Sequence, residues 1–294
     1  MPRISICIAT YKRPEGLAAL LQSINVQEFR DDVTVEILIV DNDPPTAEGV
    51  VSDFALTSPY DVRYLEQPEP NIALTRNAGV SAATGDFIWF VDDDEVAEPT
   101  CLQRLLDAAQ DFNADVVYGP VVPSFDGPIA EWLKPLHNRP IHETGTISMA
   151  RRTGNTLVRA SVLDLIDGPF NIAYGLTGGE DSMLFRQLEA KGLTLVDSED
   201  AIVTETVPLD RSSWGWLLAR KRRLGQIYGR QTVDLQGSRL GKDVAVVSVK
   251  AIVQVVGWAG AALVSRRGRT QRSDYLLRMW TNVGKLEGVI GRQQ

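Results

Sequence analysis

Short apolar runs alternate with helical patterns along the first 120 residues of the chain. Five runs have the length and content of buried strands, and three segments between them place apolar residues at helical spacing. The runs are 4–9, 35–40, 62–65, 87–91 and 116–121, and the helical segments are 14–24, 72–83 and 99–112. This alternation predicts an α/β fold, with a mostly parallel sheet covered by helices on both faces.

The pattern loosens after residue 119 and becomes regular again near residue 156. The loose stretch is rich in proline and aromatic residues, which favours an ordered loop over a site. Strands are then predicted at 156–158, 193–196 and 202–203, with helices at 180–190 and 214–228. We expect a catalytic domain over 1–210, with a nucleotide-binding half at about 1–118 and an acceptor-binding half at about 119–210. A basic helical region, 211–294, would follow.

Charge is distributed unevenly along the 294 residues. Residues 1–210 carry 14 Lys and Arg against 34 Asp and Glu, whereas residues 211–278 carry 14 against 3. Such asymmetry indicates two surfaces that meet different partners. A nucleic-acid partner is not favoured, because the chain lacks zinc-ligand spacing, an aromatic RNA-binding signature and a G-K-[ST] loop.

The N-terminus and the cysteines indicate a cytosolic protein. The apolar run near Met1 is short and has no A-x-A cleavage site, so we expect it to stay in the mature protein as a strand. Cys7 and Cys101 have no paired spacing, which favours neither a disulfide nor a zinc site.

Four consecutive acids, residues 92–95, follow directly on a buried apolar run. Their mutual repulsion calls for a cation, and Mg²⁺ or Mn²⁺ prefers carboxylate oxygens. Alternation along a strand would point Asp92 and Asp94 the same way, toward one ion or one nucleotide. The alternative is a solvated turn that caps the helix after residue 99.

Four ordered motifs resemble the family 2 glycosyltransferases of the GT-A fold. They are S-I-C-I-A-T-Y-K-R-P at 5–14, Asp41, D-D-D-E at 92–95 and G-G-E-D at 178–181. Further segments resemble the bacterial exopolysaccharide glucosyltransferases of the succinoglycan ExoM type: N-I-A-L-T-R-N-A-G at 71–79, G-N-T-L-V-R at 154–159 and E-T-V-P-L-D-R-S-S-W-G-W at 205–216. The similarity extends over residues 4 to about 230.

The resemblance implies a nucleotide pocket at the ends of the first strands. Thr10, Tyr11 and Arg13 would line it, and Asp41 would accept a hydrogen bond from uracil. Arg76 would lie near the base or the diphosphate; its alternative role is a salt bridge at the surface or core edge.

The resemblance also implies a role for each acid. Asp92 would contact the ribose or the metal, Asp94 would be the main metal ligand, and Asp93 could serve either purpose. Asp181 would be the base that deprotonates the acceptor hydroxyl, with Glu180 beside it orienting the acceptor or the loop. The alternative for these two is acids placed in a first helical turn by the helix dipole.

One position departs from the family pattern. Thr204 stands where related enzymes commonly place a histidine that completes the metal site. Glu205 would then substitute, or the metal would rely on Asp94, diphosphate and water. His137 and His142 are the only histidines, and we expect them in the acceptor loop or at the surface.

The basic C-terminal region is expected to contact the membrane. Residues 220–223 are basic on a helix whose other face carries Trp214 and several leucines, a pattern suited to an anionic lipid surface. The apolar stretch 244–264 is followed by Arg266, Arg267 and Arg269, but Lys250 and Gln254 disfavour a full membrane span. Surface association or a re-entrant hairpin is expected, with a buried helix or a dimer contact as the alternative.

These observations favour transfer of a hexose from a UDP-sugar, with UDP-glucose one candidate, to a lipid-linked saccharide at the cytoplasmic face of the plasma membrane. The alternatives are a sugar-nucleotide pyrophosphorylase and a non-catalytic nucleotide-sugar binding protein. The pyrophosphorylase is disfavoured because no Gly-rich, Lys-bearing phosphate loop follows the first strand. A dehydrogenase is disfavoured because no G-x-G-x-x-G is found there.

Overall fold

The computed structural model describes residues 1–238, 240–266 and 268–291. It divides into two compact units. Unit 1 consists of Met1–Ser124 and Arg139–Thr206, and unit 2 of Phe125–Asn138 and Val207–Gln294, apart from the residues not described. Residues 125–138, expected in the acceptor-binding half, thus fold with the C-terminal helices. Arg267 of the expected arginine cluster lies outside the described residues.

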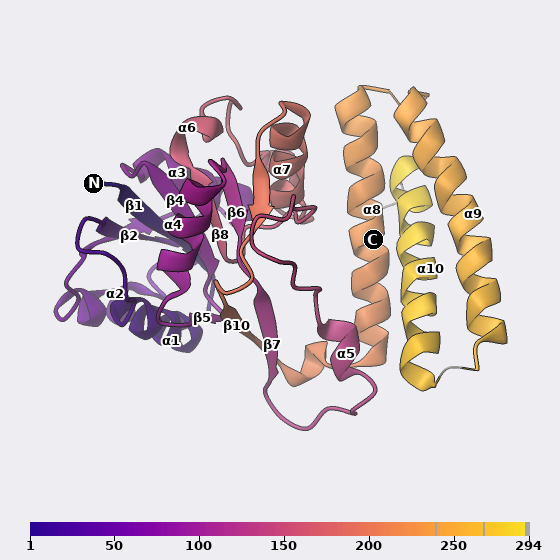
Figure 1. Ribbon diagram of the computed structural model, residues 1–294, viewed down its shortest axis with the longest axis horizontal. Coiled ribbons are helices and arrows are strands. Elements are labelled where there is room, and N and C mark those ends of the chain that lie inside the picture. The colour runs from indigo at the N-terminus through magenta and orange to yellow at the C-terminus, as the bar shows by residue number, and fades with distance from the viewer. Residues whose placement is uncertain (239, 267, 292–294) are drawn as a thin grey trace. The chain divides into compact units, whose positions relative to one another are not determined.

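A seven-stranded sheet forms the centre of unit 1, in the order β3-β2-β1-β4-β8-β6-β9 (Figure 1). Four strands on one side are parallel to one another, and β8 is antiparallel to both of its neighbours. The strands are β1 (Arg3–Thr10), β2 (Thr34–Asp41), β3 (Asp61–Glu66), β4 (Phe87–Asp92), β6 (Val116–Tyr118), β8 (Thr156–Arg159) and β9 (Leu195–Asp197).

Helices cover both faces of this sheet, as predicted. Alternation along β1 sends Ile4, Ile6 and Ile8 into one apolar core and Cys7 into the other. The first core is completed by α1 (Pro14–Asn25), α2 (Glu48–Ala55) and α4 (Cys101–Asp111). The second is completed by α3 (Ile72–Ala82), α6 (Ala160–Leu163) and α7 (Glu180–Ala190). The sequence did not predict α2, because its eight residues are fewer than the window over which helical periodicity is read.

The parallel pairing brings three polar strand ends to one edge. Thr10 lies opposite Asp41 in the β1–β2 ladder, and Ala9 lies opposite Asp92 in the β1–β4 ladder. Ligands of open α/β sheets bind beyond this carboxyl edge. The expected convergence of the three clusters is therefore observed.

A three-stranded sheet, in the order β5-β10-β7, lies beside the acid run. It consists of β5 (Glu95–Ala97), β10 (Val203–Val207) and β7 (Val121–Phe125). The strand predicted at 116–121 was wrong as a single element, since it divides at Gly119 and Pro120 into β6 and β7. A Cβ at Gly119 would lie 2.2 Å from the Ala201 carbonyl oxygen, so the chain turns where only glycine fits.

Unit 2 is built from three long helices, α8 (Trp214–Gln236), α9 (Lys242–Val264) and α10 (Arg269–Val289), with α10 packed against the other two (Figure 1). Glycines allow α8 and α10 to approach closely. A Cβ added at Gly225 or Gly284 would lie 2.0 Å from a backbone carbonyl oxygen of the facing helix. This small-residue packing explains why α10 lacks the wide apolar stripe by which sequence periodicity detects a helix.

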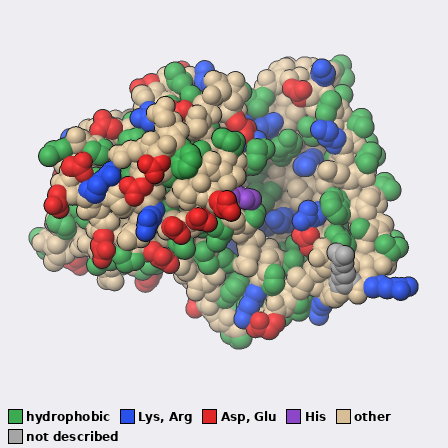
Figure 2. Space-filling model, in the orientation of Figure 1, with side chains coloured by type: hydrophobic (Ala, Val, Ile, Leu, Met, Phe, Trp, Pro, Cys, Tyr) green, Lys and Arg blue, Asp and Glu red, His purple; other side chains and the backbone are tan. Residues whose placement is uncertain are grey.

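Shorter elements complete the described chain. They are the α-helix α5 (Lys134–His137) and the 3₁₀ helices η1 (Ile172–Tyr174) and η2 (Leu209–Arg211). The charge asymmetry of the sequence is visible in Figure 2, where acidic side chains are spread over the face of unit 1 and basic ones recur over the helices of unit 2.

Candidate active site

The acid turn after β4 is held by the first motif of the chain. Asp93 is buried and accepts hydrogen bonds from the Thr10 hydroxyl at 2.9 Å, the Tyr11 amide at 3.3 Å and the Arg13 guanidinium at 2.9 Å. The same Arg13 nitrogen donates to Asp94 at 2.7 Å. Burial raises the pKa of Asp93 and outweighs the opposing effect of Arg13. The first motif and the acid run are therefore in contact through Thr10, Tyr11 and Arg13, which is necessary if they form one site.

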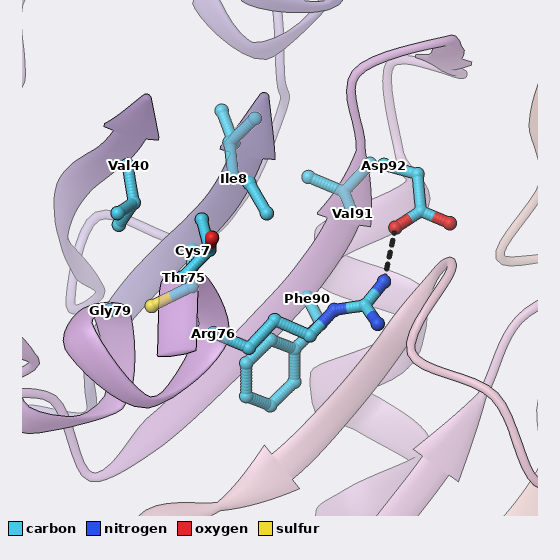
Figure 3. Close-up of a pocket in the computed structure, with 10 residues that line it drawn as sticks. Cys7, Ile8, Val40, Thr75, Arg76, Gly79, Phe90, Val91 and Asp92 are labelled. Carbon is cyan, nitrogen blue, oxygen red and sulfur yellow. Dashed lines mark hydrogen bonds and ion pairs between the residues drawn. The ribbon is translucent and has the colours of Figure 1, made fainter. Parts of the chain in front are cut away.

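Arg76 joins the acid run to the G-G-E-D motif. Its guanidinium donates to Asp92 at 3.1 Å and to Glu180, so one buried arginine bridges the end of β4 and the first turn of α7. Figure 3 shows the side chain reaching from α3 to Asp92 at the edge of a small pocket whose inner wall is apolar, with Cys7, Val40 and Gly79. Arg76 does form salt bridges, the alternative role considered for it, but their partners are Asp92 and Glu180 of the candidate site.

Two asparagines of the N-I-A-L-T-R-N-A-G motif fix the loop that precedes α7. Asn71 caps α3 by accepting from the amides of Ala73 and Leu74, and its amide donates to the Ile172 carbonyl at 3.2 Å. Asn77 exchanges two hydrogen bonds with the backbone of Phe170, of 2.8 and 3.0 Å. The motif thus positions the loop that leads into α7 and Glu180, a role its spacing alone does not reveal.

Asp181 occupies the first turn of α7 with the raised pKa expected of a general base. Gly178 and Gly179 precede it at φ angles of 79° and 102°, which other residues rarely adopt. Burial, followed by the carboxylate of Glu180, raises the pKa of Asp181 to about 7, against the opposing effect of Arg76. A carboxylate with a pKa near neutrality is suited to accept a proton at physiological pH.

Glu95 and Glu205 face each other across the small sheet. They are paired in the β5–β10 register, and Glu205 lies 3.7 Å from Arg139. Glu95 is buried, accepts from the Asp92 amide at 3.0 Å, and has a pKa raised well above its usual value by burial and by Asp92. Long-range pairing therefore brings Glu205 to the acid cluster, whereas Thr204 lies opposite Val96.

Asp41 is fully buried at the end of β2. One carboxylate oxygen accepts from the Asp43 amide at 2.8 Å, and the other accepts from the Ala47 amide at 2.8 Å and the Tyr64 hydroxyl at 2.9 Å. These bonds fold the 42–47 loop over the strand end. Both Asp41 oxygens thus already accept hydrogen bonds within the chain, and the expected bond to a uracil ring stays a prediction.

The structure refines the expectations for Asp94 and for the two histidines. β4 ends at Asp92 and the chain turns at Asp93 and Asp94, so strand alternation does not orient Asp94. Asp94 instead shares Arg13 with Asp93. His142 is exposed, and His137 lies in unit 2, where its ring stacks on Trp216 with centroids 6.1 Å apart.

The donor set is compatible with a divalent metal held jointly with a diphosphate. Within residues 1–238, 240–266 and 268–291, no three His, Cys, Asp or Glu side chains are grouped as a complete protein site. Asp92, Asp94 and Glu205 offer carboxylate oxygens, and Mg²⁺ is commonly held by one or two carboxylates together with substrate phosphates. These residues would therefore suit a metal shared with substrate phosphates better than one held by the protein alone.

Sequence reasoning missed Gly154 as a site residue. A Cβ there would lie 2.6 Å from Glu95 Oε1 and 3.0 Å from Asp92 Oδ2, so the backbone passes directly against the acids. Asn155 follows at a φ of 49° and donates to the carbonyls of Pro120 at 3.1 Å and Ala201 at 2.6 Å. The G-N pair of the G-N-T-L-V-R motif was the available signal.

We expect Gly154→Ala to reduce turnover by at least about tenfold, because the new methyl group must displace the carboxylates of Glu95 or Asp92. The control is Gly49→Ala in α2, where a Cβ meets nothing within 4 Å. Donor turnover and thermal stability should be measured for both. Unchanged turnover in Gly154→Ala would show that this backbone approach is not needed.

Comparison with known proteins defines the class of this fold and site. The family model for glycosyl transferase family 2 matches residues 5–166. The chain is also 32% identical over 300 residues to the succinoglycan biosynthesis protein ExoM of Rhizobium meliloti (strain 1021), covering 99% of this chain and 94% of that protein. The chain belongs to glycosyltransferase family 2. It is a glycosyltransferase with the α/β GT-A fold.

Solved structures agree on the fold. The mannosyltransferase PcManGT from Pyrobaculum calidifontis, in complex with GDP-Man and Mn²⁺, has a TM-score of 0.70 at 16% identity, covering 99% of this chain and 88% of that one. Residues 1–349 of S. aureus TarS, in complex with UDP, have a TM-score of 0.56 at 14% identity, covering 98% and 89%. At these identities the likeness establishes the architecture alone.

Proposed function

We propose that this protein is an inverting glycosyltransferase that moves a hexose from a nucleotide diphosphate sugar, with Asp181 as the catalytic base. The observation that carries the proposal is the Asp92–Arg76–Glu180 bridge. It ties the acid turn, suited to a diphosphate and its metal, to Glu180 in the first turn of α7, directly before Asp181, whose pKa is raised to about 7. Family membership favours transfer over pyrophosphorylase chemistry.

Each group has a role in this reaction. Asp181 accepts the proton of the acceptor hydroxyl as its oxygen attacks the anomeric carbon, and the bond from that carbon to the diphosphate oxygen breaks on the opposite face. Arg76 and Glu180 hold the first turn of α7 in position. Asp94 and Asp92, with Glu205 nearby, would hold a divalent metal, which would supply charge stabilisation to the diphosphate. Thr10, Tyr11 and Arg13 fix the acid turn.

The relatives support a class of donor and a class of acceptor for this proposal. ExoM, named for succinoglycan biosynthesis, matches nearly the full chain, which supports a place in exopolysaccharide or cell-envelope glycan assembly with a lipid-linked saccharide as acceptor. TarS was solved with UDP and PcManGT with GDP-Man. We favour a UDP-sugar, in line with the family resemblance of the sequence motifs.

The test is nucleotide binding by calorimetry, with UDP and GDP in the presence of Mn²⁺, Mg²⁺ or EDTA. We expect metal-dependent binding of UDP, weakened on the order of 10- to 100-fold in Asp94→Ala through loss of a charged ligand. Asp167→Asn, an exposed acid outside the site, is the matched control. A preference for GDP would show that the donor is a GDP-sugar and not a UDP-sugar. Failure to bind either nucleotide would contradict the proposal.

The pH dependence of the reaction follows from Asp181. The base must be deprotonated, and its pKa is raised from 3.8 to about 7, so kcat/KM should rise with pH through about 7 and level off above it. Below that value the rate should fall about tenfold per pH unit. A rate profile between about pH 5 and 9 checks this. A flat profile down to about pH 5 would exclude a base with this pKa.

We further propose that unit 2 associates with the cytoplasmic face of the membrane through α9. This helix is the one in the described ranges that is long and apolar enough to cross a membrane, and only 11% of its most apolar window is buried. Val246, Val249, Val253 and Val256 recur at helical spacing and are 41–70% exposed. Lys250 and Gln254 are exposed as well, which favours a helix lying in the interface over a span.

Membrane association is tested by co-sedimentation with vesicles containing anionic lipid. Val253→Glu should reduce the bound fraction about tenfold, because an exposed valine that enters the interface is replaced by a charge. Gln254→Glu adds the same charge to the adjacent, already polar position of α9 and is the control. Equal binding of the wild type and Val253→Glu would exclude α9 as the contact.

A further inference from the structure

Arg152 is a partly buried cation whose Nε is an unused donor. Its Nη2 donates to the Gly119 carbonyl at 2.5 Å, and the guanidinium lies 5.6 Å from the centroid of the Tyr118 ring. Its Nε is buried and has no hydrogen-bond partner. Within residues 1–238, 240–266 and 268–291, no carboxylate lies within 4.0 Å of the guanidinium.

The surroundings of Arg152 make this arrangement costly. Burial lowers its pKa, and the neighbouring guanidinium of Arg139 lowers it further, whereas Glu95, Tyr118 and Asp197 act in the opposite direction. An unpaired buried charge is strongly destabilising unless a partner arrives. The Nε donor of Arg152 therefore lacks an acceptor within the described chain.

Arg152 lies on the segment that faces the acids. Two residues further on, the backbone of Gly154 passes against Glu95 and Asp92, and Asn155 anchors the segment through hydrogen bonds to Pro120 and Ala201. Thr153 is 1% exposed, and its hydroxyl also has no hydrogen-bond partner. Two consecutive residues thus carry buried, unused donors on a segment whose backbone passes against the acids.

We propose that Arg152 binds a phosphate oxygen of a diphosphate in the active site. The inference rests on the proposed function and extends it, because it assigns an anion-binding residue outside the acid motifs. A neutral sugar would leave the charge of Arg152 unmatched, whereas a phosphate oxygen both accepts the Nε hydrogen bond and balances the charge. Arginine is also more weakly hydrated than lysine, which suits a buried phosphate contact. The diphosphate is that of the donor or that of a lipid-linked acceptor.

The test compares Arg152→Gln with Arg151→Gln. The control removes the same charge from the adjacent residue, whose guanidinium instead pairs with Glu189 at 2.7 Å. Calorimetry in Mn²⁺ measures the Kd of UDP, UMP and uridine, or of the guanosine series if the wild type prefers it. If the donor diphosphate is the ligand, Arg152→Gln should weaken UDP binding on the order of 10- to 100-fold and leave uridine binding unchanged.

A second assay distinguishes the source of the phosphate. If the acceptor supplies it, UDP affinity and donor hydrolysis stay as in wild type, while KM for a lipid-diphosphate saccharide rises by a similar factor. Arg152→Lys keeps the charge and should therefore retain part of the phosphate affinity. It replaces Arg152→Gln in both assays if that variant does not fold. Binding and KM within about twofold of wild type in the Arg152 variants would overturn the inference. A wild type that binds no nucleotide would overturn the proposed function as well, a separate outcome.

Discussion

Asp181→Asn is expected to reduce kcat for glycosyl transfer by a factor on the order of 10² to 10⁴, the usual contribution of a general base. The amide is nearly isosteric with the carboxylate but cannot accept the acceptor's proton. Asp181 Oδ1 accepts from the Ser182 amide at 2.5 Å, a contact that the asparagine oxygen can retain, so the first turn of α7 should stay folded. The Kd for the donor should therefore remain near that of wild type.

The comparison that isolates the base is steady-state kinetics of wild type, Asp181→Asn and Asp167→Asn. Asp167 is exposed on the preceding loop and makes no contact with the site, so its variant should match wild type. A loss of donor binding in Asp181→Asn would indicate a structural role. Full activity would remove Asp181 from the mechanism and direct attention to Glu180, which is 4% exposed.

Arg76→Met should destabilise unit 1 by about 3 kcal/mol, because removal of one partner leaves a buried carboxylate uncompensated. The side chains of Arg76 and Glu180 are 12% and 5% exposed, so solvent cannot replace the lost pairing. Activity should fall as well, since the same arginine positions the turn that carries Asp181. Urea denaturation followed by fluorescence measures the free energy of unfolding.

A double substitution separates the charge effect from packing. Glu180→Gln added to Arg76→Met removes the stranded charge and should recover part of the lost stability while leaving turnover low. Arg30→Met, at an arginine whose side chain is 47% exposed, should change stability little. Wild-type stability in Arg76→Met would show that the bridge does not hold the site together.

Much of the fold was predictable because its signals are local. The apolar run 35–40, which lies in β2, and the helical spacing in α1 and α7 are local features of the sequence. The bounds of α7 are those that the sequence predicted. The polar residues at the strand ends were predictable for the same reason, because parallel pairing fixes which ends meet. These features include Thr10, Asp41 and Asp92 at one edge.

Contacts between distant segments were not predictable. Nothing local indicates that Asn77 holds Phe170, that Arg76 reaches Glu180, or that Glu205 pairs with Glu95 across two short strands. The close packing of α8 on α10 depends on glycines whose partners lie about sixty residues away. The roles of these residues depend on which distant segments meet in the fold, and helical or strand periodicity does not encode this.

The most direct test of the account is release of nucleotide from a panel of UDP- and GDP-sugars, measured for wild type, Asp94→Ala and Asp181→Asn with Mn²⁺, Mg²⁺ or EDTA. Slow hydrolysis reports the donor without the natural acceptor. The account predicts metal-dependent turnover of one donor, lost in Asp94→Ala and strongly reduced in Asp181→Asn with donor binding retained. Donor binding without turnover under any condition would contradict it and favour a non-catalytic nucleotide-sugar binding protein.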